Sequence, residues 1–204
     1  MIILFLDTET TGKLDFNASH ISPNQPDLVQ LAACLFDERS GLILGSMNTI
    51  ISPYPNADAT KPLLFKISPE VSGIHGISQA QAIKFGVPRR TALSLFNFFC
   101  RSAEAICAHN KEFDKTVMLS AYHREEVPHR MEHLKEQCTM KAATPILKLP
   151  KPFKATKADP YKWPSLMECY KHFFNVEFEG AHNAMNDVMA MVKVWIELRK
   201  IGAI

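Results

Sequence analysis

The pattern of hydrophobic and polar residues predicts β-strands in the first part of the chain. The run Ile2 to Leu6 is apolar at every position, which is typical of a central strand buried by helices on both faces. Two further strands are expected at Leu28 to Asp37 and Leu42 to Ser52, with a hairpin turn at Glu38 to Gly41. A short apolar segment, Ala105 to Ala108, indicates a fourth strand. The first three strands are expected to form a meander.

From Ser78 onward, apolar residues recur at the three-to-four spacing of helices. Ser78 is a suitable N-cap, Pro88 suits a first helical turn, and Leu93, Phe96 and Cys100 fall on one helical face. Further helical patterns cover residues 110–125, 139–148, 164–174 and 183–200. Strands followed by alternating strands and helices predict an α/β fold, with a central mixed β-sheet flanked by helices.

Length and composition indicate an ordinary globular chain. The 204 residues are about 1.4 times a typical domain length of roughly 150, so we expect a single domain over residues 1–204. A content of 47% hydrophobic and 22% charged residues excludes disordered, collagen-like and coiled-coil classes. The net charge of +2 is too balanced for a protein that coats nucleic acid.

Cysteines and apolar runs favour a cytoplasmic location. The five cysteines are odd in number and contain no CxxC pair, which disfavours both a disulfide framework and a thiolate zinc site. The opening apolar run of five residues is too short for a signal sequence or a membrane span. We therefore expect no membrane partner.

Two acidic residues follow the first strand. Asp7 and Glu9 are two positions apart, and strand periodicity points both carboxylates to the same side. A solvated strand end would give the same letters, but acids at the tip of a central strand lie where α/β sheets place their sites.

A second polar group follows the short strand at Ala105 to Ala108. His109 and Asn110 come first, and Asn110 could cap a helix that carries Phe113 inward and Asp114 toward the same sheet edge. The alternative is a capped surface helix.

A third group precedes the last amphipathic helix. His182 and Asp187 are five residues apart, which on one continuous helix is a net rotation of about 140°. If both face one point, His182 must precede the helix and Asp187 must lie in its first turns. Gly180 makes the necessary turn easy.

In order and spacing, these three groups resemble the exonuclease motifs of the DEDDh superfamily, which includes the proofreading subunit of bacterial DNA polymerase III, ribonuclease T and oligoribonuclease. The matching segments are Phe5-Leu6-Asp7-Thr8-Glu9-Thr10-Thr11-Gly12, His109-Asn110-x-x-Phe113-Asp114 and His182-x4-Asp187. Ile74-His75-Gly76-Ile77-Ser78, with Glu70 upstream, is similar to a further segment of the polymerase III branch.

The resemblance implies a ribonuclease H-like fold and 3′-to-5′ removal of nucleoside 5′-monophosphates with two divalent cations, Mg²⁺ or Mn²⁺. It also implies that Asp7, Glu9, Asp114 and Asp187 hold the metals and that His182 is the general base. Contacts to the terminal nucleotide are expected from Thr8, Thr10, Thr11, Glu70, His75 and Asn110.

The chemistry explains the residue types. Hard divalent cations prefer oxygen ligands and can relieve charge on both the attacking and the leaving oxygen of a phosphodiester. Two carboxylates 4 Å apart repel by about 4 kcal/mol at an effective dielectric constant of 20, so converging acids make sense chiefly with cations present. A neutral imidazole can take a proton from the attacking water near neutral pH.

The expected substrate is the 3′ end of single-stranded DNA, because the segment around His75 is similar to the polymerase branch. RNA, as in ribonuclease T or oligoribonuclease, is the alternative, and a catalytically silent nucleic-acid-binding module is a third hypothesis. Only 17 residues follow Asp187, which disfavours a constitutive polymerase subunit.

The least regular stretches are residues 12–27 and 148–162. The second has two interpretations: a grip on a single strand, or a solvated connector in which Trp163 packs down as the next helix begins. It combines lysines with aromatic residues, namely Lys148, Lys151, Lys154, Lys157, Lys162, Phe153, Tyr161 and Trp163.

Overall fold

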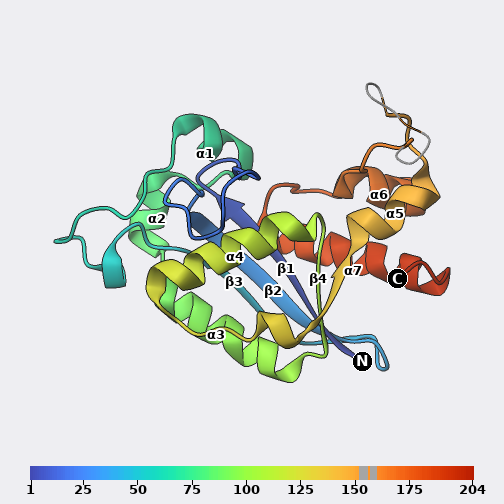
Figure 1. Ribbon diagram of the computed structural model, residues 1–204, viewed down its shortest axis with the longest axis horizontal. Coiled ribbons are helices and arrows are strands. Elements are labelled where there is room, and N and C mark those ends of the chain that lie inside the picture. Colours follow the sequence, from blue (N-terminus) through green and yellow to red (C-terminus); the bar gives the residue numbers. More distant parts are fainter. Residues whose placement is uncertain (152–155, 157–159) are drawn as a thin grey trace.

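A five-stranded mixed sheet forms the centre of the molecule (Figure 1). The structure is a computed structural model that describes residues 1–151, 156 and 160–204. The strand order is β3-β2-β1-β4-β5; β1, β2 and β3 are antiparallel neighbours, and β4 and β5 run parallel to β1. The strands are β1 (Ile2–Thr10), β2 (Leu28–Asp37), β3 (Leu42–Ile50), β4 (Ala105–Ala108) and β5 (Lys135–Cys138).

Seven helices surround the sheet among the described residues. They are α1 (Pro69–His75), α2 (Gln79–Phe85), α3 (Arg89–Ser102), α4 (Lys111–Glu125), α5 (Thr139–Leu147), α6 (Leu166–Phe174) and α7 (Ala184–Lys200), with short 3₁₀ turns at Pro55–Ala57 and Met131–His133. The predicted α/β fold with a flanked mixed sheet is therefore confirmed.

Each face of the sheet has its own apolar core. Alternate residues of β1 point to opposite faces, so Leu4 and Leu6 pack on the side of α3 and α4, whereas Ile3 and Phe5 pack on the side of α7. Figure 1 shows α4 and α7 on opposite sides of the sheet. On the α7 side, Trp195 meets the Phe5 ring edge-on at 5.9 Å between centroids. The helix α7 therefore packs on the same face of β1 that carries Asp7 and Glu9.

β1 is longer than its apolar run predicts. Its ladder with β2 continues through Asp7 opposite Ala32 and Glu9 opposite Gln30, so both acids belong to the strand and do not follow its end. The backbone hydrogen bonds of β2 explain this extension, because they hold the polar half of β1 in extended conformation.

The irregular segment 12–27 has no helix or strand, but buried polar side chains hold it in place. The Gln25 amide donates to the carbonyls of Asp15 (2.9 Å) and Ala18 (3.1 Å) and accepts from the Asp15 N–H. Asp27 accepts from Arg124 at 2.6 Å and from Arg89 at 2.7 Å. The chain that leaves the end of β1 is thus tied to α4 and α3.

Several sequence expectations need correction. The strand Lys135–Cys138 and the helix Pro69–His75 were not predicted, since the first has few apolar residues and the second is short and contains Gly73. Trp163 is 63% exposed and does not pack down. Three other residues of this stretch, Phe153, Lys154 and Lys157, lie outside the described residues.

The five cysteines are all buried and free, as expected for a chain without a disulfide framework. In the part of the chain that the structure describes, none of the helices has the length and apolar character needed to cross a membrane.

Candidate active site and metal centre

The three polar groups of the sequence meet at the carboxyl-terminal end of β1. Asp7 and Glu9 lie on this strand, Asp114 lies in the first turn of α4, and Asp187 lies in the first turn of α7. Their carboxylates interact electrostatically, because Asp114, Asp187 and Glu9 all raise the pKa of Asp7. Segments more than 100 residues apart therefore build one acidic site.

Strand alternation decides which side each acid takes. Asp7 and Glu9 share the α7 face with Ile3 and Phe5, whereas Thr8 faces α4. Glu9 consequently lies beside the start of α7. Asp114 reaches the site from α4, on the other side of the sheet.

One compact group of potential metal ligands forms among the described residues. Glu9, His182 and Asp187 each offer a ligand atom, and these atoms lie within 4.8 Å of one another. Asp7 and Asp114 are outside this tight group, but Asp114 raises the pKa of both Glu9 and Asp7, and Glu9 also raises the pKa of Asp7. The imidazole of His182 is therefore part of the cluster of potential metal ligands, although the sequence analysis expected it to act only as a base.

Burial and mutual repulsion oppose ionisation at the site. Burial, followed by Asp187 and Asp114, raises the pKa of Glu9 to about 8. Burial also raises the pKa of Asp114 to about 7, although hydrogen bonds from Thr8 act in the opposite direction. The pKa values of Asp7 and Asp187 are raised too, again chiefly by burial. A divalent cation would favour the ionised forms, so the donor set suits Mg²⁺ or Mn²⁺.

Thr8 holds Asp114 in place. Its backbone N–H and its hydroxyl both donate to the same carboxylate oxygen of Asp114, at 3.0 and 2.9 Å. The Thr8 side chain is buried on the α4 side and is fully engaged by this contact. The Thr8 hydroxyl is therefore used within the protein, and a contact of Thr8 with the terminal nucleotide stays a prediction.

The neighbouring threonines also use their hydroxyls within the protein. Thr10 donates to the carbonyl of Gly12 at 2.6 Å, and the Thr11 hydroxyl accepts from the Asp27 N–H at 2.9 Å. Both contacts shape the turn that leaves β1, and Thr10 is buried. Their side chains stabilise this turn, and their contacts with the terminal nucleotide stay a prediction.

His182 precedes α7, as the helical geometry requires. Its backbone is left-handed (φ 65°), and its N–H donates to the Asp187 carboxylate at 3.0 Å. The Asn186 amide donates to the carbonyl of Gly180, which itself has φ 71°. Asn183 caps α7 through its side-chain oxygen, which accepts from the Met185 N–H. The two asparagines thus build the turn that presents His182.

Asn110 is at the N-cap position of α4, but its side chain makes no capping hydrogen bond. Its backbone is left-handed (φ 65°), and its carbonyl accepts from the Phe113 N–H. Phe113 packs partly buried against the core, as expected. The Asn110 amide is therefore not needed for helix capping.

The segment with Glu70 and His75 forms α1. Glu70 is exposed in the first turn, whereas His75 is buried and accepts from the Ile77 N–H through Nδ1 at 3.1 Å. This contact leaves the proton on Nε2, an atom with no hydrogen-bond partner among the described residues. Burial lowers the pKa of His75 and keeps the ring neutral.

Gln30 escaped the sequence analysis, and the supporting contacts of His109 were not predicted. Gln30, opposite Glu9 on β2, accepts from the Ala184 N–H (3.4 Å) and so joins the sheet to the first residue of α7. His109 bridges the Thr139 hydroxyl and the Pro164 carbonyl, and burial lowers its pKa to about 4. Gln30 could have been singled out from the sequence, because it is a polar residue within the otherwise apolar strand Leu28–Asp37.

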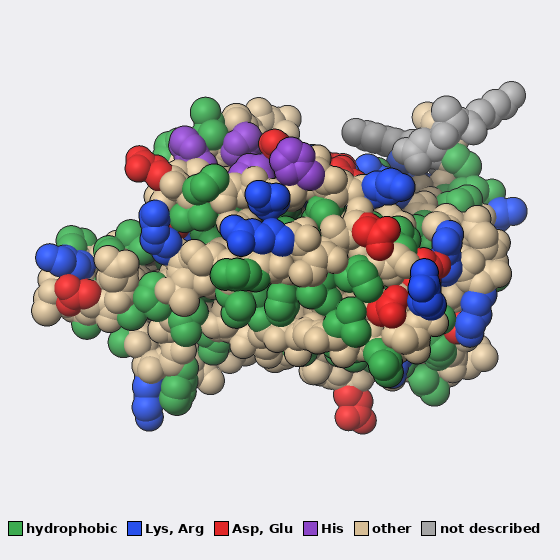
Figure 2. Space-filling view, turned by 90° about the horizontal axis from the view of Figure 1, so that it is seen from below, with side chains coloured by type: hydrophobic (Ala, Val, Ile, Leu, Met, Phe, Trp, Pro, Cys, Tyr) green, Lys and Arg blue, Asp and Glu red, His purple; other side chains and the backbone are tan. Residues whose placement is uncertain are grey.

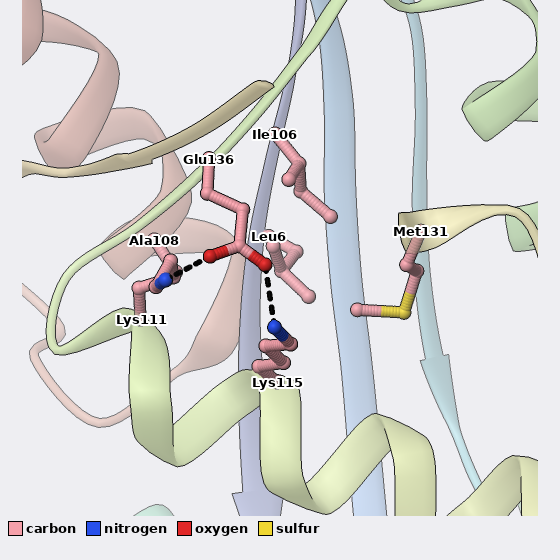
Figure 3. Close-up of a pocket in the computed structure, with 7 residues that line it drawn as sticks. All are labelled: Leu6, Ile106, Ala108, Lys111, Lys115, Met131 and Glu136. Atoms are coloured by element: carbon pink, nitrogen blue, oxygen red, sulfur yellow. Dashed lines mark hydrogen bonds and ion pairs between the residues drawn. The ribbon is translucent and has the colours of Figure 1, made fainter. Parts of the chain in front are cut away.

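Next to the site, α4 turns two lysines toward β5. Lys111 and Lys115 both pair with Glu136, over a small hollow lined by Leu6 and Met131 (Figure 3). The hollow measures about 10 Å³, which is room for about one water molecule. It is too small for a nucleotide, so the acidic end of β1 is the better candidate site.

Comparisons with known proteins identify similar structures and a sequence family. Solved structures similar to the chain include Escherichia coli exonuclease I in complex with a dT13 oligonucleotide (TM-score 0.71, 17% identity, 97% of this chain and 41% of that chain). They also include exonuclease X in complex with 5′ overhanging duplex DNA (TM-score 0.61, 21% identity, 98% of this chain and 92% of that chain). No curated protein sequence matches the chain.

These likenesses confirm the ribonuclease H-like arrangement of the sheet and its helices. The chain spans about two fifths of the length of exonuclease I. Residues 4–195 match the sequence family RNase_T, described as Exonuclease. The protein therefore belongs to the RNase T family of exonucleases.

Proposed function

We propose that the protein is a metal-dependent 3′-to-5′ exonuclease that releases nucleoside 5′-monophosphates from single-stranded DNA. The observation that carries this proposal is the convergence of four carboxylates from β1, α4 and α7, with raised pKa values. Buried acids that repel one another cost stability unless cations neutralise them, so selection for function is the simplest reason for the arrangement.

Asp7, Glu9, Asp114 and Asp187 would hold two divalent cations, Mg²⁺ or Mn²⁺. When bound, the cations supply relief of negative charge on the attacking and leaving oxygens of the phosphodiester. The protein contributes a fixed set of oxygens. Thr8 orients Asp114, and the backbone N–H of His182 orients Asp187.

His182 would act as the general base. Its side chain is exposed beside Glu9 and Asp187, so its ring can take a proton from the attacking water and pass it to solvent. The turn built by Asn183 and Asn186 limits the positions that the ring can adopt.

Substrate recognition would involve Asn110, Glu70 and His75. The Asn110 amide makes no capping bond, and His75 has an unpartnered Nε2–H among the described residues. The Asn110 amide is free to bond to the terminal nucleotide, whereas the Nε2 of His75 is buried near the Thr10 backbone. Thr8, Thr10 and Thr11, at the end of β1 and in the turn after it, would also contact the terminal nucleotide.

The choice of DNA rests on the similarity of the Glu70 and His75 segment to the proofreading branch. RNA, as in ribonuclease T or oligoribonuclease, uses the same chemistry, and a 2′-OH is recognised by one or two hydrogen bonds. A silent binding module is less favoured, because all five catalytic side chains are present. The match to exonuclease I bound to dT13 is compatible with a single strand in this fold.

The test uses a 5′-labelled single-stranded oligonucleotide, in DNA and RNA versions, with Mg²⁺, Mn²⁺ or chelator. We expect a ladder that shortens from the 3′ end only with metal, and faster on DNA. Asp7→Asn should abolish it, whereas the matched variant Asp58→Asn, at a half-buried position on the loop before α1, should not. A protein that binds both strands but shortens neither would contradict the proposal.

A further inference from the structure

A groove outside the acidic site is lined by histidines and arginines. It consists of two hollows, of about 760 and 440 Å³, that share a wall formed by Val127, Pro128 and His129. The larger hollow lies between α4 and the 12–27 segment, and the smaller one lies between α3 and the chain that follows α4. Figure 2 shows histidine side chains gathered on one part of the surface, with arginine or lysine side chains beside them. We call this surface the histidine groove; its imidazole and guanidinium side chains are those of His20, His123, His129, His133, Arg101, Arg124 and Arg130.

The charge of the histidine groove favours an anionic ligand. Among the described residues, Glu126 is the only carboxylate that lines it, against three arginines. Arg124 is already paired with Asp27. Arg101 and Arg130 are exposed and form no ion pair within the part of the chain that the structure describes. Two guanidinium groups are therefore available for phosphate oxygens, which they can bind through two parallel hydrogen bonds.

Packed side chains hold the floor of the histidine groove in place. The His129 ring lies against the Tyr122 ring at 5.1 Å between centroids, and its Nε2 is 4.0 Å from the Glu132 carboxylate. The Asn97 amide donates to the Pro128 carbonyl at 2.9 Å and accepts from the Tyr122 hydroxyl at 3.0 Å. A surface that is already formed loses little conformational entropy when a ligand binds.

We propose that the histidine groove binds the part of a single-stranded nucleic acid that precedes the 3′ end held by the acidic site. Imidazole rings and guanidinium planes stack on unpaired bases, and both groups donate hydrogen bonds to phosphates. A duplex has no free base faces, and an acidic peptide has no bases, so this combination of groups favours a single strand. The choice of ligand rests on the proposed function.

Helix α4 connects the histidine groove with the acidic site. Asp114 lies in the first turn of α4, and His123 lies nine residues further along the same helix. At about 1.5 Å per residue, this separation is about 14 Å along the helix axis. A stacked strand advances about 3.4 Å per nucleotide, so about four nucleotides cover the distance. A strand of 12 nucleotides can therefore occupy both places, whereas a stacked strand of three nucleotides cannot.

Fluorescence anisotropy of the full chain in chelator measures binding without hydrolysis. We expect 5′-labelled 12-nucleotide oligo(dT) to bind, and the double variant Arg101→Gln/Arg130→Gln to weaken its affinity about 10-fold at low salt. The slope of log K against log salt concentration should become shallower by about 1.4, because each phosphate contact on a single strand contributes about 0.7. The control is Arg39→Gln, which removes an exposed guanidinium in the hairpin between β2 and β3.

A second pair of variants tests the stacking of bases on the histidine groove. His123→Ala should weaken binding of the 12-nucleotide strand at least 5-fold, because it removes an exposed ring. His123→Phe keeps an aromatic ring and should bind the strand nearly as tightly as the wild type. Equal losses of affinity in the two variants would overturn the stacking role.

Kinetics with Mg²⁺ separate the histidine groove from the acidic site. Arg101→Gln/Arg130→Gln should raise KM for the 12-nucleotide strand about 10-fold with kcat unaffected, and should leave KM for a three-nucleotide strand unchanged. A double variant that binds the longer strand as tightly as Arg39→Gln, with the same salt dependence, would overturn the proposal. So would an acidic peptide of equal charge that binds the wild type as tightly as the strand does. A wild type that binds the strand through the groove but never shortens it would support this inference and refute the proposed function.

Discussion

Replacing Glu9 by glutamine should make the metal-free protein more stable at alkaline pH. The pKa of Glu9 is raised from 4.5 to about 8, first by burial and then by Asp187 and Asp114. Glutamine keeps the size of the side chain but cannot ionise. The substitution therefore removes the cost of a buried carboxylate that repels its neighbours.

The sign of the effect follows from the raised pKa. The protonated Glu9 carboxyl stabilises the folded state fully below pH 4.5, and this stability is lost as the pH rises through about 8. At about 1.4 kcal/mol for each pKa unit, the loss reaches about 4 kcal/mol by pH 8. Solvent reaches part of this half-buried group and screens it, which leaves about 2 to 3 kcal/mol.

Thermal unfolding measures this difference directly. For a chain of this size, 2 to 3 kcal/mol corresponds to a rise in Tm of roughly 5–10 °C for Glu9→Gln in chelator at pH 8. At pH 5 the variant and the wild type should differ little. Saturating Mg²⁺ should stabilise the wild type by about 2.7 kcal/mol at 100 times its Kd and should stabilise the variant less.

The control is Glu132→Gln, which removes an exposed carboxylate outside the site and should leave Tm unchanged at both pH values. If Glu9→Gln melts no higher than the wild type at pH 8 in chelator, the acids do not repel one another as described. Equal stabilisation of both proteins by Mg²⁺ would separately refute a metal site that includes Glu9.

Three further outcomes are expected. Asp7→Asn should lower the rate of nucleotide release more than 1,000-fold, which is on the order of 4 kcal/mol in activation free energy, without lowering Tm. A variant that retains half the wild-type rate would exclude a catalytic role for Asp7. Thr8→Val removes the hydroxyl that donates to Asp114 and should lower kcat about 10-fold, or roughly 1.4 kcal/mol. Thr8→Ser keeps the hydroxyl and should keep kcat near the wild-type value. Equal losses of kcat in the two variants would mean that the Thr8 methyl group matters through packing, and not the hydrogen bond. Asp27→Asn weakens the ion pairs with Arg124 and Arg89 and should lower the urea midpoint of unfolding by an amount equivalent to about 1 to 3 kcal/mol. An unchanged midpoint would mean that these ion pairs do not stabilise the segment 12–27.

The sequence predicts the fold where burial leaves a clear pattern. β2 and the turn before β3 have the expected bounds, and the apolar residues Leu93 and Phe96 of α3 are buried as the helical spacing requires. β5 escaped because its residues, Lys135–Cys138, pair at an edge of the sheet and carry no apolar alternation. The hydrophobic pattern of a segment reports its own burial, whereas β5 is a strand because it pairs with β4, about 30 residues earlier in the sequence.

The site is partly predictable for the same reason. Helical geometry correctly put His182 before α7 and Asp187 in its first turn, because a rotation per residue is a local property. The contact of Thr8 with Asp114 spans 106 positions and could not be read from spacing. The hydrogen bonds of the Thr10 and Thr11 hydroxyls with the turn after β1 could not be predicted from the sequence either.

The dependence of both the sheet and the acidic centre on α7 has a consequence for biosynthesis. While the ribosome is still producing this helix, one side of the sheet has no cover for Phe5, Phe36 or Ile3, and neither Asp187 nor His182 has reached Glu9. The cluster of Glu9, His182 and Asp187 would then form in a single step, when α7 docks on the sheet. The acidic centre therefore cannot assemble before α7 packs on the sheet.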